Sequence, residues 1–426
     1  MAHQLFITMQ NVSVHSEIGL LEGVIIHTPG MEVEKMTPEN AERALYSDIL
    51  NLSVASEEYR QFKGVLQKHC VTYEVKELLT EVFAVKNVKE NLLEQVCTNE
   101  GVPELKRPLL NLSDNETALQ LIEGVDLIRD NLTRYLSDER YSLRPLHNFL
   151  FTRDASIGLY NKVLIGKMAS NVRERESVIM EAIFKYHPLF GVETLNASSL
   201  QNRQAFDQIR IEGGDVQIAR NDVLVIGTGI RTSTQGVDFI IEAIKQQKSG
   251  THHIIVQELP STPESFIHLD MVFTMLDRDA CMVYEPLILS HNRFRTIHIT
   301  INNGKVEQIS TQSNLLSALK AVGFDLNPVK CGGDDAWHQE REQWHSGANF
   351  FAIAPGVIIG YERNIYTIDA LNKKGFDVVT ANDIINNGAS IPSEKTVITI
   401  GGAELARGGG GARCMSMPVK RSSVAW

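Results

Sequence analysis

A short β-branched strand that ends on glycine and is followed by arginine recurs along this 426-residue chain. Ile165-Gly166, Ile226-Gly227 and Ile359-Gly360 end three such strands, and Arg173, Arg231 and Arg363 follow them. After Arg231, a Thr-Ser cap precedes apolar residues at helical spacing, which predicts a helix. A strand-and-helix unit repeated roughly every 60 to 75 residues favours packing around a common centre, although a plain α/β sandwich also fits.

The segment 74–136 departs from this pattern. Its apolar residues fall at helical spacing, first from Leu78 to Phe83 and later from Leu121 to Leu132. Ser113 stands three residues before a glutamate, which is the signature of a capping box at a helix start. We therefore expect a small helical domain at 74–136. It would be inserted into a catalytic domain made of residues 1–73 and 137–426.

Composition narrows the functional class. A formal net charge of −11 argues against a nucleic-acid partner. Neither an apolar run long enough for a transmembrane helix nor a signal-peptide pattern is visible, so we expect a cytoplasmic protein. Five scattered cysteines fit reduced thiols, and the absence of CxxC or HExxH spacing argues against a structural or catalytic zinc site.

Three short acidic turns supply candidate site residues. FTRD carries Asp154, EGGD carries Glu212 and Asp215, and HLD carries His268 and Asp270. Two residues apart, His268 and Asp270 would face the same side of an extended strand. Singly, each has an ordinary explanation as a turn cap, a solvated carboxylate or a surface histidine. A radial arrangement of the units would bring the turns together.

The stretch 401–418, GGAELARGGGGARCMSMP, adds a nucleophile. Glycines allow close approach of backbone to a ligand, and Cys414 beside Arg413 is expected to have a lowered pKa. A disordered tail with an idle cysteine is the alternative. With the acidic turns, a thiol suits attack on a guanidinium carbon, since carboxylates pair with a planar cation. A cysteine hydrolase that acts on an amide fits the same set.

Several longer stretches together carry a family resemblance. They are VHSEIGLLEGVIIHTPG (14–30), LHNFLFTRD (146–154), EGGDV (212–216), HLDMVF (268–273), REQWHSGANFFAIAPGVIIGYERN (341–364) and RGGGGARCM (407–415). In this order, along almost the whole chain, they resemble the arginine deiminases of the guanidino-group-modifying superfamily. The resemblance implies a five-bladed α/β propeller, pentein-like, with an inserted helical domain. It also implies hydrolysis of free L-arginine to citrulline and ammonia without a metal or a cofactor.

The resemblance assigns catalytic roles by position. It implies that Cys414 is the nucleophile and His268 the general acid and base. Glu212 would orient His268 and keep it protonated. Asp154 and Asp270 would hold the guanidinium.

The same resemblance assigns the substrate's far end. Asn148, Arg173 and Arg231 match the positions that hold the amino-acid end of arginine, and two arginines suit a carboxylate. The expected partner is thus a small molecule, neither nucleic acid nor membrane, with a homo-oligomer possible.

The loop before Cys414 departs from the family pattern, Arg-Gly-Arg-Gly-Gly-Gly-His-Cys. Gly409 replaces the second arginine, Ala412 the last glycine and Arg413 the histidine. These changes bear on rate and substrate choice. They keep two alternatives open: another enzyme on the same scaffold, either an amidinotransferase or a dihydrolase that gives ornithine, and a non-catalytic arginine-binding protein.

Overall fold

The computed structural model of the protein describes residues 11–37, 48–197, 208–386, 390–391 and 394–426. Within them, five sheets of three or more strands share one pairing pattern. In each sheet an antiparallel pair is extended by a strand that runs parallel to one member and is reached through a connection that contains at least one helix. The repeat expected from the sequence is therefore present as five α/β units.

The strands of the units are as follows. The first holds β5 (Ser156–Leu159), β6 (Lys162–Ile165) and β7 (Thr194–Leu195). The second holds β8 (Val216–Arg220), β9 (Val223–Thr228), β10 (Thr251–Glu258), β13 (Thr296–Asn302) and β14 (Lys305–Gln312). The third holds β11 (Phe273–Met275), β12 (Ala280–Val283) and β15 (Asn327–Lys330), and the fourth β16 (Phe351–Ala354), β17 (Val357–Tyr361), β18 (Asp377–Thr380) and β19 (Thr396–Ile400). The fifth holds β1 (Leu21–Ile26), β2 (Val71–Glu74) and β20 (Met417–Arg421).

Helices cover these sheets. They are α1 (Met31–Glu34), α3 (Leu52–His69), α9 (Thr152–Ala155), α10 (Glu174–Tyr186), α12 (Thr234–Lys245), α13 (Glu285–Ile288), α14 (Leu315–Ala321), α15 (Ala336–Trp344), α16 (Ile365–Lys373) and α17 (Ala381–Asn386). The helix expected after Arg231 is α12, and the Ser233 side chain caps it by accepting from the Gly236 N–H. None of the described helices is both long and apolar enough to cross a bilayer.

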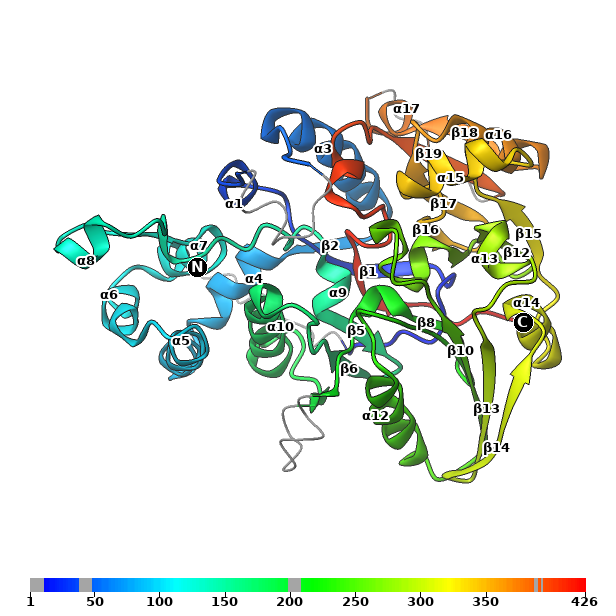
Figure 1. Cartoon of the computed structure of the whole chain (residues 1–426), viewed down its shortest axis with the longest axis horizontal. Coiled ribbons are helices and arrows are strands. Elements are labelled where there is room, and N and C mark those ends of the chain that lie inside the picture. Colours follow the sequence, from blue (N-terminus) through cyan, green and yellow to red (C-terminus); the bar gives the residue numbers. More distant parts are fainter. Residues whose placement is uncertain (1–10, 38–47, 198–207, 387–389, 392–393) are drawn as a thin grey trace, which may run out of the picture.

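The fifth unit joins distant parts of the chain. Strand β20 pairs antiparallel with β1, from the opposite end of the sequence, and the two lie side by side near the middle of the molecule (Figure 1). Because Cys414 directly precedes β20, this pairing fixes the position of the candidate nucleophile.

Residues 74–136 are largely helical. They contain α4 (Val75–Val82), α5 (Val88–Asn99), α6 (Lys106–Leu110), α7 (Asp114–Glu123), α8 (Leu132–Tyr135) and β3 (Val125–Asp126), and β3 pairs with β4 (Tyr141–Leu143), which lies beyond residue 136. The capping box at Ser113 is present at the start of α7. The helical pattern expected to run on to Leu132 is wrong, however. Gly124, at φ 81, ends the helix, and Ile128 and Leu132 are exposed.

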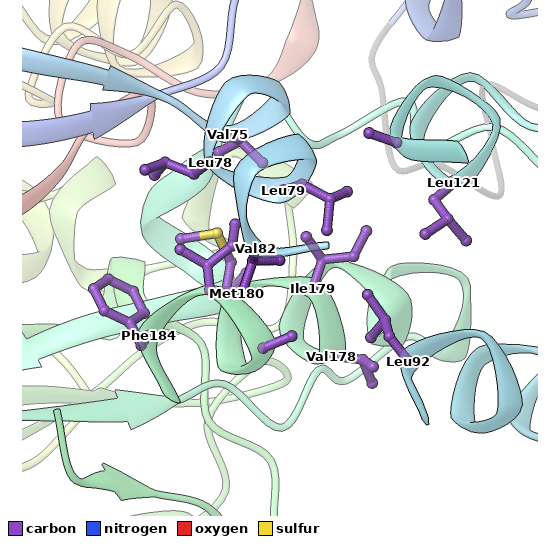
Figure 2. Packing of buried hydrophobic residues seen from close by; sticks show 14 of the residues in the cluster. Val75, Leu78, Leu79, Val82, Leu92, Leu121, Val178, Ile179, Met180 and Phe184 are labelled. Atoms are coloured by element: carbon purple, nitrogen blue, oxygen red, sulfur yellow. The ribbon is translucent and has the colours of Figure 1, made fainter. Parts of the chain in front are cut away.

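These helices pack on the rest of the chain through one hydrophobic cluster. Side chains of α4, among them Leu79 and Val82, face Ile179 and Met180 of α10 (Figure 2). All four are buried, and burial of each such side chain stabilises the fold by roughly 1.5–3 kcal/mol. The helical segment and the strand-rich part therefore share a core.

Candidate active site

The glycine-rich stretch before Cys414 is ordered and buried, so it is not a loose tail. Its first turn is held by Glu58 of α3, whose carboxylate accepts from the N–H groups of Ala403, Glu404 and Leu405 at 2.8–3.1 Å. The stretch then runs through a 3₁₀ helix, Leu405–Gly408, to a cysteine whose exposure is 2%. A buried carboxylate with several donors fixes the backbone that leads to the thiol.

The Cys414 sulfur lies between an amide and a carboxylate. Asn349 Nδ2 donates to Sγ at 3.1 Å, and Asp270 Oδ2 and Oδ1 lie 3.6 and 3.8 Å from it. Asn349 also accepts, through Oδ1, from the backbone N–H groups of Arg413 and Cys414. The sequence analysis did not single out Asn349. The only signal in the sequence was an amide residue in SGAN, inside the longest of the family-like stretches.

His268 lies in a second cluster, against two of the expected carboxylates. Its Nε2 donates to Glu212 Oε2 at 2.9 Å, and its Nδ1 lies 3.7 Å from Asp154 Oδ1. All three side chains are buried. With Nε2 held by Glu212, Nδ1 is the ring nitrogen left to exchange a proton.

The local backbone at HLD differs from the sequence expectation of an extended strand. Residues Leu269–Met271 form a 3₁₀ turn that begins after His268. Asp215 Oδ1 accepts from the Leu269 N–H at 2.9 Å, which favours the turn. His268 and Asp270 therefore reach the site from a turn rather than from one face of a strand. Asp154 likewise lies on the short helix α9 rather than at a strand end.

The surroundings of His268 favour its charged form. Burial alone would lower the pKa of this imidazole, but Asp154, the hydrogen bond with Glu212 and the charge of Asp215 together raise it to about 9. Burial conversely raises the pKa of Asp215, to about 7. The charges of Arg231 and His268 outweigh burial at Glu212 and lower the pKa of its carboxyl. An ionised Glu212 beside a protonated His268 is thus the resting arrangement near neutral pH.

The Cys414 thiol, in contrast, is held neutral. Burial, followed by the negative charges of Asp270 and Asp154, raises its pKa well above the usual range. The expected lowering by Arg413 is wrong for the free protein, because that effect is smaller than burial and the two carboxylates. Formation of the thiolate therefore requires an additional positive charge close to Asp270 and Asp154.

The residues expected to hold the substrate's amino-acid end lie next to the His268 cluster. Arg173 Nη1 donates to Asp154 Oδ2 at 2.8 Å and lies 3.9 Å from Glu212, and Arg231 Nη1 lies 3.5 Å from Glu212 Oε1. Asn148 is in the buried turn before α9, where its backbone carbonyl oxygen accepts from the Phe151 N–H. The two arginines therefore meet at Glu212, paired with carboxylates, whereas Asn148 lies in the turn that leads into the helix of Asp154.

Arg413, the residue that departs from the family pattern, is buried within the site. Its guanidinium donates to Asp270 Oδ2 at 2.8 Å and, through Nε and Nη2, to both oxygens of Glu17 at 3.0 and 3.2 Å. Burial alone would raise the pKa of the Glu17 carboxyl, but the charge and hydrogen bonds of Arg413, with the charges of Arg153 and Arg421, together lower it to about 2. Glu17 was also missed by the sequence analysis, although it lies in the family-like stretch 14–30.

One donor set has the geometry to ligate a metal ion. Asp154, Glu212 and His268 bring ligand atoms within 4.8 Å of one another. Arg173 and Arg231 already pair with the two carboxylates, and a protonated imidazole has no free lone pair. Because the carboxylates of this cluster are already paired with arginines, the cluster disfavours binding of a metal cation.

Comparison with known proteins identifies the family. The model of the arginine deiminase family matches residues 42–421. The chain belongs to the arginine deiminase family. Arginine deiminases of Borrelia duttonii and Borrelia garinii subsp. bavariensis are 33% and 32% identical to it. The alignments cover 98% and 97% of this chain and 99% and 98% of those proteins.

Solved structures similar to this family member show the fold. SxtG, an amidinotransferase from Microseira wollei, matches with a TM-score of 0.56 and 13% identity over 97% of this chain and 98% of its own. The N-terminal domain of ArgZ, a cyanobacterial arginine dihydrolase, matches with a TM-score of 0.52 and 13% identity over 94% and 97%. The fold is thus the α/β, pentein-like fold of the amidinotransferases.

Proposed function

We propose that this protein hydrolyses the guanidino group of free L-arginine to L-citrulline and ammonia. Membership of the arginine deiminase family supports the reaction. The observation that carries it in the structure is a thiol beside one carboxylate and a protonated imidazole beside another, because this pairing suits attack on a cationic carbon.

The substrate's own charge activates the nucleophile. A guanidinium bound between Asp154 and Asp270 neutralises the two carboxylates that, after burial, raise the pKa of the Cys414 thiol. The thiol then loses its proton to solvent, and Asn349 Nδ2 donates to the resulting thiolate. Free protein is thereby kept inert until a guanidinium arrives.

The chemistry proceeds in two halves. The thiolate bonds to the guanidinium carbon. The bond between this carbon and a terminal nitrogen then breaks as His268 gives a proton from Nδ1 to the departing ammonia. A thiouronium remains on Cys414. Neutral His268 then takes a proton from water, which adds to the same carbon. The C–S bond breaks with its electron pair on sulfur, and the proton of the added hydroxyl passes to that sulfur, which releases neutral citrulline and restores the Cys414 thiol.

Glu212, Arg231, Arg173 and Asn148 position the reactants. Glu212 orients His268 by the bond to Nε2, which leaves Nδ1 for the reaction. Arg231 and Arg173, with Asn148, bind the α-carboxylate of the substrate through charge-assisted hydrogen bonds.

The same proposal extends to the architecture. Five like units, with the last closed by β20 pairing on β1, support a five-bladed propeller around the site. The five helices between residues 74 and 136 support an inserted helical domain, with 1–73 and 137–426 as the catalytic domain.

Product analysis tests the function. Purified protein is incubated with arginine, and ammonia, citrulline and ornithine are quantified by mass. We expect citrulline and ammonia in equal amounts, and none from Cys414→Ser, because a serine hydroxyl is hardly ionised at neutral pH. Ornithine with two ammonia molecules would instead indicate a dihydrolase. Turnover that requires an added amine acceptor would indicate an amidinotransferase.

A further inference from the structure

Arg413 places a guanidinium, the same chemical group as the reacting end of the proposed substrate, inside the active site. The side chain is 1% exposed, and its nitrogens have acceptors on every side. Besides Glu17 and Asp270, it donates to the backbone carbonyls of Val216 at 2.8 Å and Gly214 at 3.4 Å. Two carboxylates and two carbonyls fix the guanidinium plane, so Arg413 is an anchored cation rather than a mobile one.

The anchored cation occupies one side of Asp270. Oδ2 of Asp270 accepts from Arg413 Nη1 at 2.8 Å. No N–H or O–H group of the described residues donates to the other oxygen, Oδ1, and the Cys414 sulfur lies 3.8 Å from Oδ1 and 3.6 Å from Oδ2. Asp270 therefore has one oxygen held by an arginine and one that no nitrogen donor occupies.

Asp154 shows the same division. Its Oδ2 accepts from Arg173 Nη1 at 2.8 Å, whereas Oδ1 is buried without a hydrogen-bond partner among the described residues and faces His268. An arginine thus holds one oxygen, Oδ2, of each carboxylate. The other oxygen of each, Oδ1, is left to accept from a bound guanidinium.

We propose that Arg413 is a positioning residue which, anchored on Glu17, holds Asp270 so that a single oxygen of that carboxylate binds the substrate guanidinium. The inference rests on the proposed function. It assigns to a residue that departs from the family pattern a part in recognising the substrate's charge.

The decisive measurement is the discrimination between arginine and citrulline. Citrulline has the same length but carries an uncharged ureido group, so it gains little from a correctly placed carboxylate. Calorimetric titration of a Cys414→Ala parent gives both dissociation constants without turnover. The parent is expected to bind arginine more tightly than citrulline.

Arg413→Lys, added to this parent, keeps the charge but removes the planar fork, and one ammonium cannot hold Glu17 and Asp270 in the same geometry. We expect arginine affinity to fall about ten- to a hundredfold, the range of one charge-assisted hydrogen bond, with a change of less than threefold for citrulline. Arg421→Lys is the matched control. Arg421 is also buried, but it donates to the carbonyls of Gly19 and Ala352 and does not touch Asp270. Its replacement should leave the arginine-to-citrulline ratio unchanged.

Glu17→Gln keeps the test informative should Arg413→Lys fail to fold. This change weakens the anchor while Arg413 stays in place. The preference for arginine over citrulline should therefore fall, by a smaller factor than in Arg413→Lys. Equal losses for arginine and citrulline in the variant that folds would overturn the inference and leave a purely structural role. A parent that binds neither ligand would overturn the proposed function as well.

Discussion

At the scale of single residues, the proton on His268 sets the pH range of the proposed reaction. Its raised pKa, about 9, means that the imidazolium needed for ammonia departure is present below that pH and is lost as the pH rises through it. Glu212→Gln removes the supporting negative charge, so the pKa falls. We expect the alkaline limb of kcat/KM to move to lower pH by about one unit or more, measured from pH profiles of both proteins.

An exposed carboxylate serves as the control for that experiment. Glu242 lies on the surface of α12 and pairs only with Lys245 among its described neighbours, so Glu242→Gln should leave the profile in place. An alkaline limb that stays fixed in Glu212→Gln would show that Glu212 does not act through His268.

The α-carboxylate assignment is tested most cleanly at Arg231. Arg173 also holds Asp154, so its loss would disturb guanidinium binding as well. In the described structure Arg231 pairs only with Glu212. Arg231→Ala should weaken arginine roughly ten- to a hundredfold, with a far smaller loss for agmatine, which lacks the carboxylate. Steady-state constants for the two substrates measure this. Equal losses would contradict the assignment.

Residues with distinctive local patterns could be predicted from the sequence, and those that act through distant contacts could not. Asp154, Glu212 and His268 stand in short polar turns, and the structure places them together. Glu17 and Asn349 lie in family-like stretches, but nothing local shows that they reach a residue hundreds of positions away or next to the thiol. The thiol pKa also escaped prediction, because burial depends on the whole fold.

At the scale of elements, α3 supports the backbone that leads to the nucleophile. Glu58 accepts from successive N–H groups at 403–405, and a glutamine offers only one accepting oxygen and no charge. Glu58→Gln should lower the free energy of unfolding by about 1–3 kcal/mol and increase hydrogen exchange at 401–409. Urea unfolding and exchange mass spectrometry measure the two effects.

Glu57, next to Glu58 in the sequence, provides the control substitution. Glu57 is on the same helix but points outward to Arg60, and a surface pair of this kind contributes little. Glu57→Gln should leave stability nearly unchanged and leave exchange at 401–409 unaltered. Matching effects in the two variants would remove the role given to Glu58.

Elements differed in how well their sequence indicated them. The strands β1, β6, β9 and β17 follow their β-branched runs because each run is buried on both faces. The helical spacing beyond Glu123 was misleading, since Gly124 ends α7, and Ile128 and Leu132 are exposed. Periodicity predicts a helix only where a buried surface receives it.

At the scale of the whole molecule, the shared core predicts cooperative unfolding. Leu79 of α4 is fully buried against the α10 side of the cluster (Figure 2). Leu79→Ala should cost about 2–5 kcal/mol and should lower the midpoints of helix loss and activity loss together. Circular dichroism and residual activity on heating compare them. Leu132→Ala, at a residue 72% exposed on α8, should be nearly neutral.

Two separate transitions would instead show that the helical segment folds by itself. A repeated strand unit was predicted from the strand endings, and the number five came only from the family resemblance, whereas the fusion of the helical segment with α10 was not predicted. A boundary at 74–136 marks a change in periodicity, and periodicity carries no information on which surfaces meet.

The neutral state of Cys414 also bears on how the protein withstands oxidants. Peroxide attacks thiolates rather than thiols, and a sulfenic acid at the nucleophile would stop turnover. Because burial and the carboxylates keep the sulfur protonated in the free protein, the resting molecule should tolerate oxidising conditions that inactivate cysteine enzymes whose thiolate is permanent. Reactivity is then confined to the moments when a cation fills the site.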